Sequence, residues 1–204
     1  MTPALTQPEP TDSAPGVLVL AAGRSNRFGS DKRQALLDDN VSVLDRLLTT
    51  LEVSGLAVCV CLAPGDNDLS VNLAARGVAT VYCPRAHEGL GATLAHGITA
   101  VHTWPATLIA LADMPWINAS TLQALASHCS ADTIVAPRFD GRQGHPVGFG
   151  RTFYPLLRAL QGDTGGRAIL RSNPASVQFV DVDDPAIHWD IDTPADLTRG
   201  DSAS

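Results

Sequence analysis

The sequence predicts a single three-layer α/β/α domain with a mostly parallel sheet and a small β-hairpin. Short apolar segments alternate with amphipathic ones between residues 17 and 136, which is typical of right-handed βαβ units. After Pro137 the pattern changes to short glycine-rich segments, which indicate an added hairpin. The chain of 204 residues fits one domain, which we place at 16–199 between a flexible tail at 1–15 and a short tail at 200–204.

The first part of the chain supplies the parallel strands and the helices between them. Leucines at positions 44, 47, 48 and 51 have the spacing of an amphipathic helix, and Gly55 is suited to end it. Apolar runs predict buried strands at 17–21, 57–63, 78–82, 107–112 and 133–136. Further helices are expected at 66–77, where Asp66 can serve as the cap, at 91–102 and at 120–129.

The last part of the chain predicts shorter elements. Segment 138–150 has the pattern of two short strands around a turn at Asp140-Gly141. A helix is expected at 151–160, and a second short helix follows the turn in GDTGG. Final strands are expected near 177–180 and 187–191.

Composition excludes several classes of protein. A formal charge of −7 argues against nucleic-acid binding, which usually needs a basic surface. No apolar run approaches the ~20 residues of a membrane span. The N-terminal stretch lacks the basic start and apolar core of a secretory signal, and the four cysteines lack C-x-x-C spacing. We therefore expect a cytoplasmic protein with buried, reduced thiols.

Unusual polar residues stand at the ends of three predicted strands. Ala22, Gly23 and Arg24 follow the first strand, and Asp113 follows the run TLIALA. Asp190 and Asp192 lie in HWDIDTPADL, at the end of the last predicted strand. Ligands of open α/β sheets bind beyond the carboxyl ends of the strands, so we expect these residues to meet at one rim.

The loop after the first strand concentrates positive charge. Arg24, Arg27, Lys32 and Arg33 fall within ten residues, although the whole chain has only 14 Lys and Arg. Backbone N–H groups together with cations suit a polyphosphate. Two other readings stay open. One is a solvated basic loop, and the other is a hydrolase with Ser25 as nucleophile, although Arg27 replaces the second glycine of G-x-S-x-G.

Asp113 is the sharpest single candidate. A buried aspartate at a strand end is costly unless it is paired, caps a helix or binds a metal. Magnesium takes oxygen ligands and shares them with phosphates, so we favour a metal ligand over a helix cap. Two glycine-rich segments, GRQGHPVGFG and GDTGGR, place Arg142, His145, Asp163 and Arg167 where backbone can approach a ligand closely. Turn formation explains these glycines equally well.

Six motifs follow one another along the chain: LAAGRSNRFGSDK, HEGLGATLAHGI, LADMP, GRQGHPVGF, LQGDTGGRAIL and DIDTPADL. Together they resemble, in the same order, those of nucleotidyltransferases with a Rossmann-like, glycosyltransferase-A-like fold. Among these, the chain is most similar to MobA-like NTP transferases and molybdenum cofactor cytidylyltransferases, over about residues 17–197. Two features depart from the family pattern: Phe28 replaces the common Met, and SDKRQALLDDN replaces the usual run around the lysine.

The resemblance implies Mg²⁺-dependent transfer of CMP from CTP to molybdopterin, with Mn²⁺ as the alternative metal and pyrophosphate as the product. It gives catalytic roles on the triphosphate to Arg27 and Lys32. It assigns the metal to Asp113, with Asp192 or Asp190 as second ligand. It assigns the acceptor to His145, Arg142 and Arg167. It assigns the nucleotide to Leu20, Ala21, Ala22, Gly23, Arg24, Pro84, Gly89 and Thr93.

Several alternatives remain at this stage. The nucleotide could be GTP, and the acceptor a sugar phosphate, methylerythritol phosphate or a phospholactate-type acid. A different class is a pterin-cofactor carrier without catalysis. Ala22 favours CTP, because the related guanylyltransferases usually have a glycine there that leaves room for a purine. The resemblance also implies delivery to a molybdoenzyme or its chaperone, and we expect a monomer.

Overall fold

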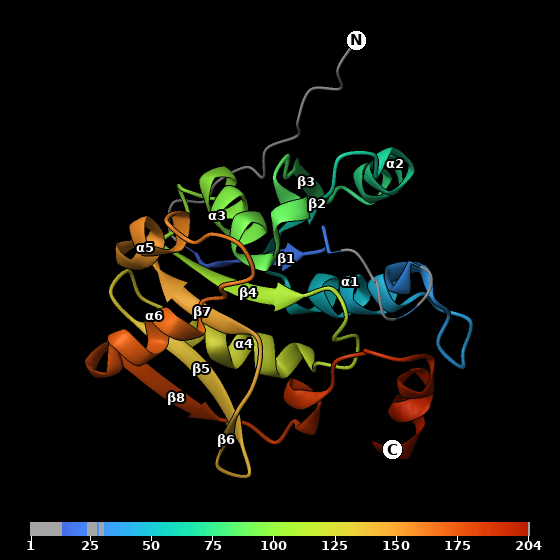
Figure 1. The fold of residues 1–204 in the computed structure, drawn as a ribbon. Coiled ribbons are helices and arrows are strands. Elements are labelled where there is room, and N and C mark those ends of the chain that lie inside the picture. The colour runs from blue at the N-terminus through green and yellow to red at the C-terminus, as the bar shows by residue number, and fades with distance from the viewer. Residues whose placement is uncertain (1–13, 24–27, 29–30, 204) are drawn as a thin grey trace.

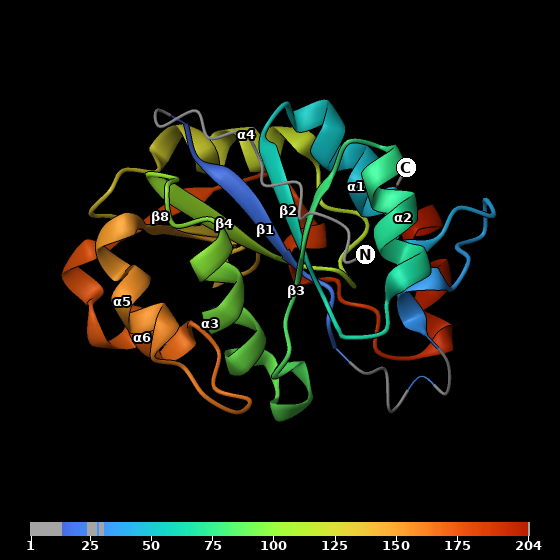
Figure 2. The same cartoon turned by 90° about the horizontal axis from the view of Figure 1, so that it is seen from above.

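The computed structural model describes residues 14–23, 28 and 31–203, which form an eight-stranded sheet between two layers of helices (Figures 1 and 2). The predicted residues Arg24, Ser25 and Arg27 lie outside the described ranges, as does most of the predicted N-terminal tail. The sheet order is β3-β2-β1-β4-β7-β5-β6, and β8 pairs with β5. The strands are β1 (Gly16–Leu20), β2 (Ala57–Leu62), β3 (Ala79–Tyr82), β4 (Ala106–Leu111), β5 (Ile134–Phe139), β6 (Arg142–Gln143), β7 (Val147–Gly150) and β8 (Val177–Asp181).

The parallel part of the sheet brings the predicted site to one rim. β1 is hydrogen-bonded in parallel to both β2 and β4, with Leu20 in register with Cys61 and Leu111. β7 runs antiparallel between β4 and β5, while β8 is parallel to β5. The carboxyl ends of β1 and β4 therefore lie side by side, as the alternation of strands and helices predicts.

Helices cover both faces of the sheet, and Figure 2 shows the two layers from above. On one face lie α1 (Val43–Ser54), α2 (Asn67–Ala75) and α4 (Ala119–His128), whose leucines pack in a core with Val17 and Val19. On the other face lie α3 (Leu90–Ala100), α5 (Tyr154–Arg158) and α6 (Arg167–Ser172), which pack with Leu18 and Phe149. Among the described residues, no helix is long and apolar enough to span a membrane.

The predicted hairpin is present between β5 and β6. Asp140 and Gly141 have φ angles of 49° and 73°, in the left-handed region that a tight hairpin turn requires. β6 is only two residues long, and the chain then returns to the sheet as β7. Gly55, predicted to end the first helix, also has left-handed φ of 71° at the C-terminus of α1.

The predicted strand at 187–191 is wrong. This segment forms a 3-10 helix (Pro185–His188) and then crosses the rim of the sheet without joining it. Ile187 and Ile191 are buried, which explains the strand-like alternation, but their backbone groups bond to loops: Ile191 N donates to Asp113 O at 2.9 Å. A second 3-10 segment (Pro194–Ala203) follows, so the domain limits and tails given above remain predictions.

Candidate active site

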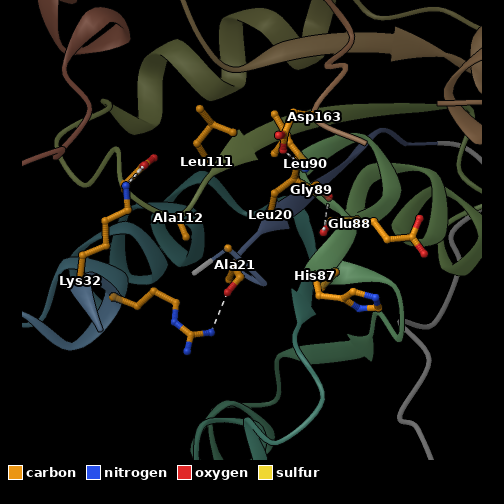
Figure 3. Close-up of a pocket in the computed structure, with 15 residues that line it drawn as sticks. Leu20, Ala21, Lys32, His87, Glu88, Gly89, Leu90, Leu111, Ala112 and Asp163 are labelled. Atoms are coloured by element: carbon orange, nitrogen blue, oxygen red, sulfur yellow. Dashed lines mark hydrogen bonds and ion pairs between the residues drawn. The ribbon is translucent and has the colours of Figure 1, made fainter. Parts of the chain in front are cut away.

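A cavity of about 480 Å³ opens at the rim where β1 and β4 end (Figure 3). Lys32 and Ala21 lie on one side of it, and His87, Glu88 and Gly89 lie on the other (Figure 3). Its full lining comes from five chain segments: Leu20, Ala21, Gly23, Lys32, Arg33, Ala86, His87, Glu88, Gly89, Leu90, Thr93, Leu111, Ala112, Asp113 and Asp163.

The loop after β1 lines this cavity with its backbone. Leu20, Ala21 and Gly23 belong to the lining, and the Ala21 amide donates to Cys61 O at 3.1 Å. Ala22 is 2% exposed and packs in the core, so its methyl group is not part of the lining. Pro84 is exposed and also lies outside the lining. Of the five nucleotide-binding candidates in the loop after β1 and at Pro84, three therefore line the cavity: Leu20, Ala21 and Gly23.

The opposite wall is the start of α3. Gly89 has a φ of 124°, and a Cβ there would come within 2.7 Å of the Gly162 carbonyl oxygen, so only glycine fits. The Leu90 amide donates to the Asp163 carboxylate at 3.4 Å, and Gly91 N donates to Gly162 O at 2.7 Å. The predicted residues Gly89 and Thr93 thus line the cavity, backed by the predicted turn in GDTGG, whose contact with Gly89 no local pattern indicates.

Arg33 is a fixed part of the scaffold. Its guanidinium donates to Ala21 O at 2.6 Å, to the Asp66 carboxylate at 2.7 and 2.9 Å, and to Asp31 at 2.7 and 2.8 Å. Burial alone would lower the pKa of Arg33, but the hydrogen bonds that its guanidinium donates to Asp66 and Asp31 outweigh this effect and raise the pKa. Asp66 stands at the N-cap position of α2 without capping it, because its carboxylate bonds to Arg33 and to Ala63 N.

Lys32 and Asp113 form the central polar contact of the site. Asp113 comes two residues after β4, and its Oδ2 accepts a hydrogen bond from the Lys32 ammonium. The same ammonium donates to Ile191 O at 3.0 Å. The other carboxylate oxygen, Oδ1 of Asp113, is buried and has no hydrogen-bond partner among the described residues. A buried oxygen without a partner is suited to accept a hydrogen bond from a ligand or to coordinate a cation.

The last rim segment brings Asp192 to the same place. Its Oδ1 lies 4.0 Å from Lys32 Nζ, and its side chain is 57% exposed. Asp190 is exposed and lies close enough to His145 for its charge to affect that residue's pKa. Neither Asp190 nor Asp192 stands at the end of a strand. They lie in the irregular part, residues 189–193, of segment 185–193, here called the crossing segment, which passes along the rim of the sheet.

A second cavity, of about 350 Å³, adjoins the first and shares Leu20, Leu90 and Leu111 with it. Most of its wall is apolar, and its polar side chains come from Gln143, His145 and Arg167. Arg142 is exposed on β6 and does not line it. The remaining lining residues are Leu94, Ile109, Gly144, Val147, Phe149, Gly165, Gly166 and Leu170.

His145 links the two cavities electrostatically. Burial lowers its pKa, although the charges of Asp113 and Asp190 act in the opposite direction. Its Nδ1 is buried and has no hydrogen-bond partner among the described residues, and the same holds for Nε2 of His188. The His145 amide donates to Ile187 O at 2.9 Å, which fixes the loop against the crossing segment. His188 was not identified from the sequence, because a lone histidine carries no spacing signal.

Much of the sheet and both cavities lie within a region that is shared with a known protein family. The family model described as "MobA-like NTP transferase domain" matches residues 17–177, a range that includes most of β1, all of β4 and the lining of both cavities. The chain belongs to the MobA-like NTP transferase family. This confirms the family resemblance of the motifs and their fold class. As a member of that family, the MobA-like chain is a nucleotidyltransferase.

The MobA-like chain is similar to proteins with names that differ in the reaction they describe. It is 27% identical to nicotine blue oxidoreductase of Paenarthrobacter nicotinovorans, covering 90% of this chain and 94% of the relative. It is 26% identical to phosphoenolpyruvate guanylyltransferase of Sphaerobacter thermophilus, covering 84% and 81%. Rv0371c of Mycobacterium tuberculosis matches with a TM-score of 0.80 and 28% identity over 91% and 96% of the two chains. That protein's complex with manganese matches with a TM-score of 0.78 and 25% identity, over 94% of this chain and 100% of the other.

Proposed function

We propose that this protein transfers CMP from CTP to a phosphate group of molybdopterin, or of its molybdenum-bound form, and releases pyrophosphate. The observation that carries the proposal is the contact between Lys32 and Asp113 in the first cavity, which the second cavity adjoins through Leu20, Leu90 and Leu111. A phosphate of the acceptor attacks the α-phosphorus of the nucleotide, and pyrophosphate leaves from the opposite side. Such reactions depend on positioning and charge neutralisation more than on a covalent nucleophile.

The residues present fit a divalent cation. Asp113 Oδ1 is buried without a partner in the described part of the chain, and Asp192 lies near the same lysine. Within 14–23, 28 and 31–203, no three acidic, histidine or cysteine side chains form a complete metal site. Mg²⁺ is commonly held by one or two carboxylates together with substrate phosphates and water, which matches this donor set. When bound, the metal would supply charge neutralisation for the reacting phosphates.

The chain's own cations would hold the rest of the nucleotide charge. Lys32 reaches the cavity at Asp113, and its flexible stem allows the ammonium to follow phosphate oxygens. Backbone of Ala21 and Gly23 would face the base and ribose. Arg24 and Arg27 lie outside the described residues, and we keep Arg27 as a proposed contact of the triphosphate.

The second cavity supports an acceptor that carries a ring. Its wall of leucine, isoleucine, valine and phenylalanine side chains suits a flat apolar surface better than a small acid or a polyol. Arg167 and His145 could bond to polar groups of that ring or to its phosphate. This favours a pterin over phospholactate-type or methylerythritol acceptors. We keep Arg142 as a weaker candidate, because its side chain lies outside the cavity.

The choice of CTP rests on the family resemblance. The Ala22 methyl group packs in the core instead of facing the nucleotide cavity, so its position gives no direct steric reason to reject a purine. GTP is therefore the main alternative. Base contacts from the turn at residues 86–89, which lines the cavity, are the next place where selection can arise.

The test is turnover of purified protein with each of the four nucleoside triphosphates, with molybdopterin as acceptor and Mg²⁺ or Mn²⁺ present. We expect pyrophosphate release to be fastest with CTP and to require molybdopterin. Release that is fastest with GTP would replace the cytidylyltransferase assignment by a guanylyltransferase. Binding of molybdopterin without pyrophosphate release with any nucleotide would favour the carrier.

One relative is named as an oxidoreductase, so the same purified protein should also be tested for an oxidation–reduction reaction. The second cavity would suit a flat ring of an oxidoreductase substrate as well as that of a nucleotide acceptor.

A monomeric state, a cytoplasmic location and delivery to a molybdoenzyme or its chaperone remain part of the proposal. Co-purification of nucleotide-modified pterin with a molybdoenzyme would test the last point.

A further inference from the structure

Lys32 occupies the space between the two carboxylates that the proposed function assigns to a metal. Its ammonium is hydrogen-bonded to Asp113 Oδ2, lies 4.0 Å from Asp192 Oδ1 and donates to Ile191 O at 3.0 Å. The side chains of Lys32 and Asp113 are only 21% and 18% exposed, so water weakens their attraction little. One lysine thus neutralises the acidic part of the site.

We propose that Lys32 is an internal counter-ion that a nucleoside triphosphate must draw away before a divalent cation binds tightly to Asp113 and Asp192. This rests on the proposed function, because it assumes the metal and triphosphate sites named there. The consequence is cooperative binding: each of the two ligands raises the affinity for the other. Free Mg²⁺ or Mn²⁺ then binds poorly to the enzyme without nucleotide.

Electrostatics supports this competition. A divalent cation bridging Asp113 and Asp192 would fall within a few ångströms of the Lys32 nitrogen, and like charges at that distance repel strongly at a half-buried site. The lysine therefore has to move for the metal to use both carboxylates. A triphosphate offers it several negative oxygens along the same cavity wall, and a lysine stem has enough rotatable bonds to reach them.

A purely structural ion pair predicts the opposite behaviour. If Lys32 served only to hold Asp113 and the crossing segment in place, its loss would loosen both carboxylates. Metal affinity would then fall or stay unchanged when Lys32 is replaced. The sign of the change in metal affinity therefore separates the two roles.

The experiment is a titration of nucleotide-free protein with Mn²⁺, followed by the electron paramagnetic resonance signal of the free ion. We expect Lys32→Met, which keeps the length of the side chain and removes the charge, to bind Mn²⁺ about tenfold or more tighter than the unmodified protein. A single neighbouring charge changes the proton affinity of a carboxylate by about 1–3 pKa units, and we expect a change of similar size in its affinity for a metal ion. Lys32→Arg keeps the charge and should bind Mn²⁺ weakly.

The control for a change in overall charge is Arg138→Met, which removes a cation that lines neither cavity and is paired with the exposed Asp181. It should leave the Mn²⁺ affinity unchanged. Thermal melting of each variant checks that the fold is retained. Equal or weaker Mn²⁺ binding by folded Lys32→Met would overturn the proposal.

A second titration measures the coupling. We expect saturating α,β-methylene-CTP to raise the Mn²⁺ affinity of the unmodified protein, after correction for metal held by the analogue itself, and CMP to raise it much less. The gain should be smaller in Lys32→Met, because the counter-ion is already gone. Equal gains in both proteins would contradict the proposal.

The two proposals fail in different ways. If Asp113→Asn leaves Mn²⁺ binding unchanged with and without the analogue, the metal assignment of the proposed function fails. If Mn²⁺ binding depends on Asp113 but Lys32→Met does not tighten it, the metal site stands and only the counter-ion proposal fails.

Discussion

At the scale of single residues, the loop after β1 divides its described cations between two tasks. Arg33 is locked by Asp31, Asp66 and the Ala21 carbonyl, whereas Lys32 contacts the candidate metal ligand. Neighbouring residues of the same charge therefore have different functions. Arg33 orders the loop after β1, and Lys32 is the residue that we propose acts on phosphates.

Asp113 is the residue on which the proposed chemistry depends most. Asp113→Asn removes one negative charge and keeps the shape of the side chain, so the fold should survive. Turnover should fall by at least about 100-fold, the scale seen when a single charge-stabilising contact is lost. The measurement is steady-state pyrophosphate release at saturating Mg²⁺. A rate near that of the unmodified protein would exclude Asp113 as a metal ligand.

Arg33 should matter for binding and for stability. Arg33→Met leaves Asp66 and Asp31 without their shared cation and frees the Ala21 carbonyl, so we expect a loss of about 3–5 kcal/mol in unfolding free energy. KM for the nucleotide should rise more than kcat falls. Urea unfolding and steady-state kinetics measure both. Arg138→Met, which breaks an exposed pair, is the control and should change the unfolding free energy little, because solvent screens that pair.

At the scale of elements, α3 forms one wall of the first cavity, the candidate nucleotide site, and packs closely on the sheet. Gly97 makes this approach possible: a Cβ there would lie 2.5 Å from Cys61 Sγ and 2.9 Å from a Leu18 methyl carbon. Gly89, the N-cap residue of the same helix, and Thr93 in its first turn both line the cavity. The position of α3 on the sheet therefore determines the width of the site.

Gly97→Ala should force α3 away from the sheet. We expect a loss of about 1–3 kcal/mol from overpacking, together with a higher KM for the nucleotide. Cys61→Ala removes the sulfur that the new methyl group would meet, so the double variant should lose less stability than the sum of the single ones. A double-mutant cycle by urea unfolding measures this coupling. Strict additivity would contradict the proposed contact.

The crossing segment depends on a buried carboxylate. Asp184 is 2% exposed and accepts hydrogen bonds from Asn118 N at 2.9 Å, Thr121 Oγ1 at 2.7 Å and Ala186 N at 3.1 Å. Asp184→Asn turns one accepting atom into a donor, which should cost about 1–3 kcal/mol. Asp183→Asn, at the exposed neighbouring position, should have little effect. Thermal unfolding of both variants tests this role in holding α4 to the rim.

At the scale of the whole molecule, buried thiols report the integrity of the core. Cys59 and Cys61 lie two residues apart on one face of β2 and pack in the same cluster as Cys83. Burial raises the pKa of Cys59 to about 12 and that of Cys129 to about 12. The described cysteines are therefore structural thiols and form no disulfide.

These raised pKa values predict how the thiols react and how stability depends on pH. The folded thiols hold their protons more tightly than the unfolded ones, so their contribution is complete below the ordinary thiol pKa of 9.0 and is lost as pH rises toward about 12. At pH 8 a disulfide reagent should label them only as fast as the protein unfolds. The urea midpoint should be lower at pH 10 than at pH 8. Rapid labelling of folded protein would show that the thiols are accessible.

The sequence by itself determined the α/β architecture, most strands and helices, the rim where the site lies and the family. These features depend on local periodicity and on motifs that each occupy a short stretch, so they can be read without knowing the fold. The same local pattern failed at 187–191, because alternating buried residues also fit a segment that crosses the rim.

Only the tertiary structure decided which residues meet at the site. Lys32 and Asp113 are 81 residues apart, and Lys32 and Ile191 are 159 apart, so no local pattern could pair them. The same holds for the contact between Arg33 and Asp66 and for the insertion of β7 between β4 and β5. Side-chain partners are chosen by the three-dimensional packing of distant segments, and this packing turned a run of similar cations into one scaffold residue and one candidate catalytic residue.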